Sequence, residues 1–328
     1  MAQRIHLKNL ASLKNVEIAA LCDINRKTAD MVAKVYNVGS VFSDYNEMLS
    51  KGSVDAVVIT TPPSEHLGPA LAAAKKGKAV FVEKPVTETL KQCEDLLAEF
   101  KKSKATLMAG FMRRHDKALD WAHDQVASGK LGKLIGVSSS YRLVSAYPEY
   151  LKLTDQEIVG EFNPSAGYKA NRYLFLLNNL IHHADLLSWM GGHFNRLIAF
   201  GRFEDTFALQ VVVEFANGAL GRLSFAGILN TEWREGLSVD GDKGTLDAKM
   251  AFPYLPAPTE AQLTSRAGGL KTAPTVAVNT MYQDEMADFV RRAQESGGLF
   301  PSQEEIVDGQ RMVSAIEASL KTGTWASG

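Results

Sequence analysis

The sequence is poor in cysteine, in net charge and in long apolar runs, and each shortage excludes a class of protein. Its two cysteines, Cys22 and Cys93, form no CxxC pair, so neither a disulfide framework nor a zinc site is indicated. Lys plus Arg total 36 against 37 for Asp plus Glu, a balance that leaves no basic field to attract a nucleic acid. No run approaches the roughly 18 apolar residues that span a bilayer, and the opening MAQRIHLKNL lacks the apolar segment of a signal peptide. We therefore expect a cytoplasmic protein with no nucleic-acid or membrane partner and no metal.

The chain is rich instead in short apolar runs that alternate with amphipathic stretches. Hydrophobic residues fill 45% of its 328 positions, enough for the packed cores of about two domains. The runs with the length and β-branched content of strands are 16–21, 54–59, 79–82 and 106–109. The stretches between them that repeat apolar residues at helical spacing are 25–36, 65–76 and 87–103. Such alternation predicts a Rossmann-type, doubly wound parallel sheet with helices on both faces.

The second half of the chain predicts a different architecture. Residues 196–249 have the pattern of antiparallel strands joined by tight turns, among them the favoured hairpin pair Asn217-Gly218. Residues 255–278 are rich in Pro, Ala, Thr and Gly, and we expect little order there. Helices at 281–295 and 303–321 close the chain.

This change of pattern predicts two domains. We expect a dinucleotide-binding domain over residues 1–112 and a substrate-binding α/β domain over 113–328, built on an open, largely antiparallel sheet. The free face of an open sheet must be covered by helices or by another subunit. The sequence therefore predicts a homo-oligomer, a dimer or a tetramer, assembled through the second domain.

Asp23 follows the first visible strand, at the edge where parallel sheets collect their ligands. A carboxylate there accepts hydrogen bonds from the adenosine ribose of a dinucleotide and repels a 2′-phosphate, which favours NAD; Arg26 nearby leaves NADP as an alternative. Equally, Asp23 is suited to cap the helix that begins near Asn25. Sequence position does not decide between these two interpretations.

Lys84 stands between an acid and a proline directly after a buried strand. Pro85 biases Lys84 toward an extended backbone, which projects the ammonium from the carboxyl edge of the sheet. A lysine so placed can donate to a substrate hydroxyl and titrate usefully when partly buried. The alternative is a structural ion pair with Glu83.

Several strings of the sequence together resemble the glucose-fructose oxidoreductase and inositol dehydrogenase family, also called Gfo/Idh/MocA. These are ITTPPSEHLGPALAAAKKGK, VFVEKPVTETL, GFMRRHDKAL and IHHADLLSW. The resemblance covers nearly the whole chain, and the Glu-Lys-Pro loop combined with a downstream HxxD is specific. It implies an N-terminal Rossmann domain and a C-terminal α/β domain that carries substrate contacts.

The resemblance also implies roles for single residues. Lys84 corresponds to the family's catalytic-site lysine, His182 to the histidine that accepts the substrate proton, and Asn178 stands where many members carry aspartate. Since Asn178 can orient a hydroxyl but cannot share a proton, proton abstraction rests on His182. The expected cofactor contacts are Ala2, Asp23, Thr60, Thr61, Pro62, His66, Glu83 and Lys84. The expected substrate contacts are Arg113, Tyr147, Asn171 and Asp185, the acid of HxxD.

The start of the chain departs from the family pattern. Members open with a strand and a GxGxxG or GxGxxA turn, whereas this sequence begins in what resembles the following helix, with Ala2 at the third glycine position and His6 as the helix histidine. Strand 1 of a Rossmann sheet lies between strands 2 and 4. Without it, either the sheet closes up and the pyrophosphate cradle is lost, or the encoding frame continues upstream of Met1. We expect the second.

The function that the resemblance implies is hydride transfer between a nicotinamide cofactor and a hydroxyl-bearing carbon of a sugar, cyclitol or polyol. Two alternatives stay open. One is an NAD-using glycosidase of the same superfamily, and the other is a ligand-binding or scaffold protein that has lost its cofactor.

Overall fold

The computed structural model describes residues 5–144, 170–229, 232–255, 257–265, 268–274, 278, 280–295 and 297–328. These residues form two compact units, which divide between Met112 and Arg113. Tyr282–Gln303 returns to the first unit, although we expected the whole of 113–328 to form the second. No described helix combines the length and hydropathy that crossing a membrane requires.

The first unit alternates strands and helices. Its strands are β1 (Ala20–Cys22), β2 (Ser40–Phe42), β3 (Ala56–Ile59), β4 (Ala79–Val82), β5 (Leu107–Ala109) and β14 (Leu299–Phe300). Its helices are α1 (Leu7–Ser12), α2 (Arg26–Tyr36), α3 (Tyr45–Lys51), α4 (Leu67–Lys75), α5 (Leu90–Ser103) and α10 (Met281–Glu295), with a 3-10 turn, η2, at Pro63–Glu65. This confirms the parallel α/β architecture.

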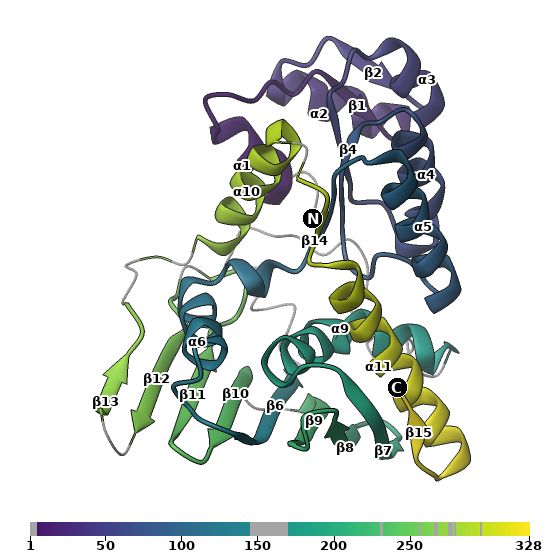
Figure 1. Ribbon diagram of the computed structural model, residues 1–328. Helices are drawn as coiled ribbons and strands as arrows, with labels where there is room; N and C mark the ends of the chain where they lie inside the picture. Colours follow the sequence, from purple (N-terminus) through teal and green to yellow (C-terminus); the bar gives the residue numbers. More distant parts are fainter. Residues whose placement is uncertain are drawn as a thin grey trace. The chain divides into compact units, whose positions relative to one another are not determined.

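The parallel strands of this unit make two hydrogen-bonded groups. β1 pairs with β2, and the second group has the order β14-β5-β4-β3. Within the described residues β1 therefore does not pair with β3. Figure 1 shows α10 and β14 from late in the chain beside the early strands.

Local sequence explains where these elements begin and what they bury. Thr89 and Gln92 form a reciprocal capping box at the start of α5, and Asn25 accepts the Thr28 backbone N–H at the start of α2. β4 is buried at every position because helices cover both faces of a parallel sheet. Its Phe81 packs with Met286 and Phe289 of α10 in one apolar cluster, which attaches that helix to the first unit.

The second unit is built on one large sheet. Its order is β13-β12-β11-β10-β6-β9-β8-β7-β15, and every pair except β6–β9 is antiparallel. The strands are β6 (Leu134–Val144), β7 (Phe194–Phe203), β8 (Phe207–Phe215), β9 (Leu220–Leu229), β10 (Arg234–Gly241), β11 (Gly244–Met250), β12 (Glu260–Ser265), β13 (Gly269–Thr272) and β15 (Ala326–Ser327). The expected hairpin turn is present between β8 and β9, where Gly218 has φ +86°. The expectation of little order over 255–278 is wrong, since β12 and β13 form there.

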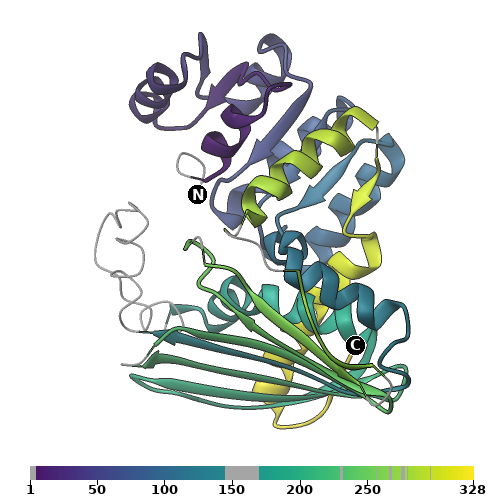
Figure 2. The same ribbon diagram turned by 90° about the vertical axis from the view of Figure 1, so that its left-hand side faces the viewer.

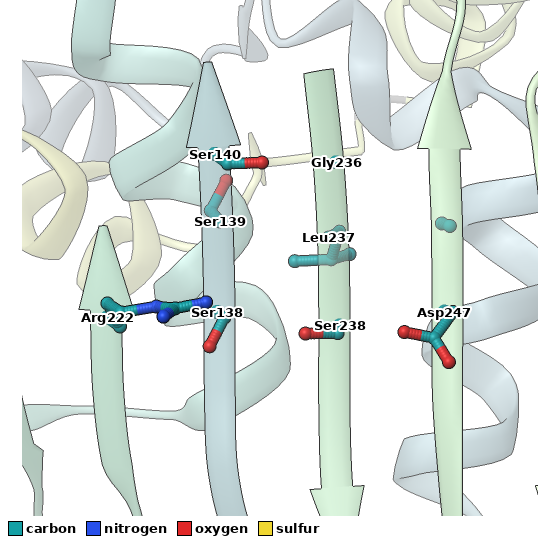
Figure 3. Close-up of a pocket in the computed structure, with 9 residues that line it drawn as sticks. Ser138, Ser139, Ser140, Arg222, Gly236, Leu237, Ser238 and Asp247 are labelled. Carbon is teal, nitrogen blue, oxygen red and sulfur yellow. The ribbon is translucent and has the colours of Figure 1, made fainter. Parts of the chain in front are cut away.

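The helices of the second unit lie on one face of this sheet. They are α6 (Lys117–Ala127), α9 (Arg172–Gly191) and α11 (Gln303–Thr322), preceded by a 3-10 turn, η3, at Met112–His115. Figure 2 shows no helix of the described residues on the opposite face. That face carries a shallow polar hollow on β6, β9, β10 and β11, where the side chains of Ser138, Arg222, Ser238 and Asp247 lie close together (Figure 3). It also exposes Phe200, which is 62% accessible.

Candidate functional site

The Glu-Lys-Pro loop follows β4 and holds its glutamate rigidly. Glu83 is 8% exposed. Its Oε1 lies 2.7 Å from His6 Nε2, and its Oε2 accepts the backbone N–H of Lys84 at 3.0 Å. Both carboxylate oxygens are therefore engaged inside the protein, so Glu83 orients the loop where we had expected a cofactor contact.

The same loop leaves Lys84 half-buried beside that carboxylate. Burial lowers the pKa of Lys84, and the negative charge of Glu83 opposes this effect without cancelling it. Burial also acts to raise the pKa of Glu83, but the hydrogen bond and charge of His6, together with Lys84, outweigh it and keep the pKa below its usual value. A lysine whose ammonium is partly desolvated can give up or share its proton more readily than a surface lysine.

His66 connects the loops that follow β3 and β4. Its Nδ1 lies 2.9 Å from the carbonyl oxygen of Pro85 and its Nε2 2.8 Å from that of Thr61. The ring is 1% exposed, so His66 fixes the two loops and does not present itself to a cofactor as expected. Thr61 and Pro62 are exposed and Thr60 is half-buried, which leaves the carboxyl end of β3 accessible.

At the end of β1 the structure decides one of the open questions. Asn25 caps α2, while Asp23 Oδ1 accepts the backbone N–H of Asn25 at 2.8 Å. The interpretation of Asp23 as the helix cap is therefore wrong, and its carboxylate is exposed at the carboxyl edge of the strand. The guanidinium of Arg26 pairs with the carboxylate of Asp30, one helical turn later, at 2.9 Å.

In the second unit, α9 carries two adjacent histidines in different environments. His182 is half-buried, whereas His183 is 3% exposed and lies 2.8 Å from Ser139 Oγ. Burial, with the nearby charge of Arg113, lowers the pKa of His183 to about 3, so this ring stays neutral at ordinary pH. Of the two, only His182 combines partial exposure with a place on the same helical face as Asn178, which is exposed one turn earlier.

Three of the expected substrate contacts have other tasks in the described structure. Arg113 is 2% exposed and pairs with Glu235 on β10, where burial raises the pKa of the glutamate to about 7 against the attraction of Arg113. Asn171 caps α9 by accepting the Leu174 N–H at 3.0 Å. Asp185 is 1% exposed and buried against Arg114. The sequence could not signal these tasks, because motif positions do not reveal burial.

Asp185 anchors a buried ion-pair network. Nε of Arg114 donates to both of its carboxylate oxygens at 3.0 Å, and Nη2 donates to Oδ1 at 2.8 Å. Nη1 of the same arginine reaches Glu305 at 2.5 Å. The HxxD acid therefore ties α9 to the η3 turn and to α11.

We expect Asp185→Ala to lower the free energy of unfolding of the second unit by about 3–5 kcal/mol, because it leaves the Arg114 guanidinium buried with a lost partner. Chemical denaturation followed by circular dichroism measures this. Asp185→Asn, which keeps the shape and one acceptor oxygen, is expected to lower the free energy of unfolding by less than Asp185→Ala does. Wild-type stability in Asp185→Ala, together with a raised KM, would return Asp185 to the substrate contacts.

Two of the expected contacts, Ala2 and Tyr147, lie outside the described residues. The accessible candidates in the described part of the chain are accordingly Asp23, the loop after β3 and Lys84 in the first unit, with His182 and Asn178 in the second.

Two family models match the chain. Residues 1–111 match an oxidoreductase family with an NAD-binding Rossmann fold, and residues 120–247 match the GFO/IDH/MocA C-terminal domain. The two matches adjoin the division between the compact units.

Curated relatives match parts of the chain. The inositol 2-dehydrogenase of Salmonella typhimurium is 30% identical over 188 residues, 56% of this chain and 50% of that enzyme. The scyllo-inositol 2-dehydrogenase (NAD(+)) of Bacillus subtilis is 33% identical over 149 residues, 45% of this chain and 44% of that enzyme. The chain thus spans about half the length of these relatives or less.

Among solved structures, scyllo-inositol dehydrogenase from Lactobacillus casei with bound cofactor NAD(H) and scyllo-inositol superposes with a TM-score of 0.75. The superposition covers 98% of this chain and 94% of that one at 19% identity. At this identity the likeness establishes the fold alone.

Proposed function

Because the chain belongs to the Gfo/Idh/MocA oxidoreductase family, we propose that it is an NAD-dependent dehydrogenase that oxidises a secondary hydroxyl of a cyclitol. The observation that carries the proposal is Lys84, a half-buried lysine whose loop is held by a buried glutamate at the carboxyl end of β4. The relatives named as inositol dehydrogenases support a cyclitol over other polyols.

The residues at the carboxyl ends of β1 and β3 fit a dinucleotide. The exposed carboxylate of Asp23 suits the hydroxyls of an adenosine ribose and disfavours a 2′-phosphate, which supports NAD over NADP. Thr60, Thr61 and Pro62 offer an accessible loop for the rest of the cofactor. When bound, NAD would supply the acceptor for the hydride.

The residues of the chain would divide the remaining work. The Lys84 ammonium donates a hydrogen bond to the reacting oxygen and stabilises negative charge that develops there. His182 takes the proton of the hydroxyl, and Asn178, on the same face of α9, orients a hydroxyl through its side-chain amide. Each of these three side chains is at least partly exposed within its own unit.

The proposal is tested by incubating the purified chain with NAD and either scyllo-inositol or myo-inositol and following reduced nicotinamide at 340 nm. We expect turnover with NAD and a kcat/KM at least tenfold lower with NADP, because the carboxylate of Asp23 repels the 2′-phosphate. Asp23→Ser is expected to narrow that ratio. NADH binding without oxidation of either cyclitol would direct attention to other sugars or to the glycosidase alternative, and absence of NADH binding by this chain would favour the ligand-binding or scaffold alternative.

We further propose that a second copy of this chain covers the helix-free face of the large sheet. Exposed apolar side chains on that face include Phe200 and Leu220, which are 62% and 56% accessible. Light scattering that gives the mass of a monomer at micromolar concentration would refute the assembly.

We propose that the protein acts in the cytoplasm. The two cysteines are free thiols, in keeping with a reducing compartment.

A further inference from the structure

A buried carboxyl group in the first unit has no part in the function proposed above. Glu285, on α10, is 0% exposed, and within the described residues neither of its carboxyl oxygens has a hydrogen-bond partner. Its helical neighbour Met286 lies in the apolar cluster that α10 shares with β4. A carboxyl group buried without a hydrogen-bond partner destabilises the fold even when it is neutral, and far more when it is ionised, so its presence calls for a task.

Two ring contacts place Glu285 beside the His6–Glu83 pair: Tyr282, three residues before it, lies 6.4 Å from the His6 ring, and Phe289, four residues after it, lies 5.8 Å from the Phe81 ring of β4. The titratable groups on that side are Glu83 and His6, which lie 2.7 Å apart. Burial and the negative charge of Glu83 both raise the pKa of Glu285, well above its usual value. Glu83 in turn contacts His6 through Oε1 and the backbone N–H of Lys84 through Oε2. Glu285 is therefore one step removed from Lys84, with Glu83 as the link.

Four charged groups later in α10 pair with one another. Asp288 pairs with Arg292 at 2.7 Å and with Arg291, and Arg291 also reaches Glu295 at 2.5 Å. Unlike Glu285, none of the four is wholly buried.

We propose that Glu285 is a positioning residue for Lys84 that acts through Glu83. Glu285 and Glu83 form a buried pair of carboxyl groups, and Glu285 is the one that carries the proton. With Glu285 neutral, Glu83 holds the single negative charge of the pair. When Glu285 ionises, a second negative charge appears behind Glu83, and this favours the ammonium form of Lys84. The inference rests on the proposed function only in taking Lys84 as the catalytic lysine.

The directions of the two titrations support this coupling. Burial lowers the pKa of Lys84 and raises the pKa of Glu285, and the charge of Glu83 acts on both groups. Removing the charge of one ionisable group shifts the apparent pKa of the groups that it interacts with. Glu285→Gln keeps the shape of the neutral acid and removes its charge.

The direct test measures Lys84 itself and needs no enzyme activity. The full chain is labelled with trace acetic anhydride between pH 6 and 11, and peptide mass spectrometry follows the acetylation of Lys84. We expect the midpoint in Glu285→Gln to fall by about half a pH unit or more, because the ammonium loses a supporting charge. Glu295→Gln, the same change at an exposed position of the same helix, is expected to leave the midpoint unchanged. Equal midpoints in all three proteins would overturn the proposal.

A second measurement tests the neutral state of Glu285. In the folded chain this carboxyl holds its proton more tightly than in the unfolded chain, so stability falls as pH rises from about 4.5 toward the raised folded value. We therefore expect Glu285→Gln to melt roughly 3 °C or more above wild type at pH 8 and level with it at pH 4.5. A difference that does not change with pH would overturn the proposal.

If the variant does not fold, a third measurement can be made on the wild-type protein. In carbon-13 NMR of labelled glutamate, the side-chain carboxyl of residue 285 is expected to titrate well above 4.5. Titration at the ordinary value would overturn the proposal. A chain that passes these tests but oxidises no cyclitol would refute the proposed function and leave the coupling of Glu285 to Lys84 intact.

Discussion

Lys84→Ala is expected to lower kcat/KM for cyclitol oxidation by about 100- to 1,000-fold, the usual effect of removing one donor aimed at an oxygen that becomes negative. The loss should fall on kcat as well as on KM, because the ammonium contacts the reacting oxygen before and during hydride transfer. Steady-state kinetics at saturating NAD measures both. The fold should survive, because Lys84 is only half-buried and alanine removes a charged group that is costly to desolvate.

Two further variants separate charge from hydrogen bonding at this position. Lys84→Gln keeps a neutral hydrogen-bond donor on a side chain one bond shorter and is expected to recover part of the lost kcat/KM. Lys84→Arg keeps the charge with a larger, planar head group, and we expect little recovery because the two cations differ in shape and titration. Activity within a few fold of wild type in Lys84→Ala would show that the lysine is structural.

His182→Ala is expected to lower kcat by about 100-fold or more with little change in NADH affinity, because it removes the proton acceptor and no cofactor contact. A general base must be unprotonated, so wild-type activity should decline as pH falls through its pKa, and this acid limb should flatten in the variant. A pH profile of kcat measures the effect. An unchanged acid limb would assign the base elsewhere, with Lys84 the first candidate.

The neighbouring side chains provide matched controls for this result. Asn178→Asp places a carboxylate one helical turn before His182, which favours the imidazolium and should move the acid limb to higher pH. His183→Ala removes a buried ring that packs at 4.9 Å on Tyr141 and bonds Ser139. We expect it to lower stability while the acid limb keeps its position.

The sequence by itself determined the elements whose local signals are strong. The runs at 79–82 and 281–295 match β4 and α10 residue for residue, because a short continuous apolar run and the period of an amphipathic helix are both strong local signals. The short β2 and α3 were missed: the strand has three residues and the helix seven, too few to show a period. The strands over 260–272 were missed because that composition is typical of loops.

The tertiary structure alone decided which motif residues remain accessible. Lys84 and His183 are both polar residues within the motif strings. Lys84 is half-buried at the carboxyl end of β4, whereas His183 is buried and neutral in the core of the second unit. Asp185 matches the family motif, but its carboxylate is used up by Arg114. A motif specifies residue types and spacing, whereas burial depends on what packs against each face.

The pairing of groups distant in sequence was also beyond prediction. His6 and Glu83 are 77 positions apart, and α10, late in the chain, contacts this pair through Tyr282, whose ring lies 6.4 Å from that of His6. The spacing of Met281 and Phe289, four residues before and after Glu285, places this position on the apolar face of α10, but the sequence does not show what packs there. Its burial follows only from the return of Tyr282–Gln303 to the first unit, where α10 packs against β4 and carries this carboxyl into the apolar interior.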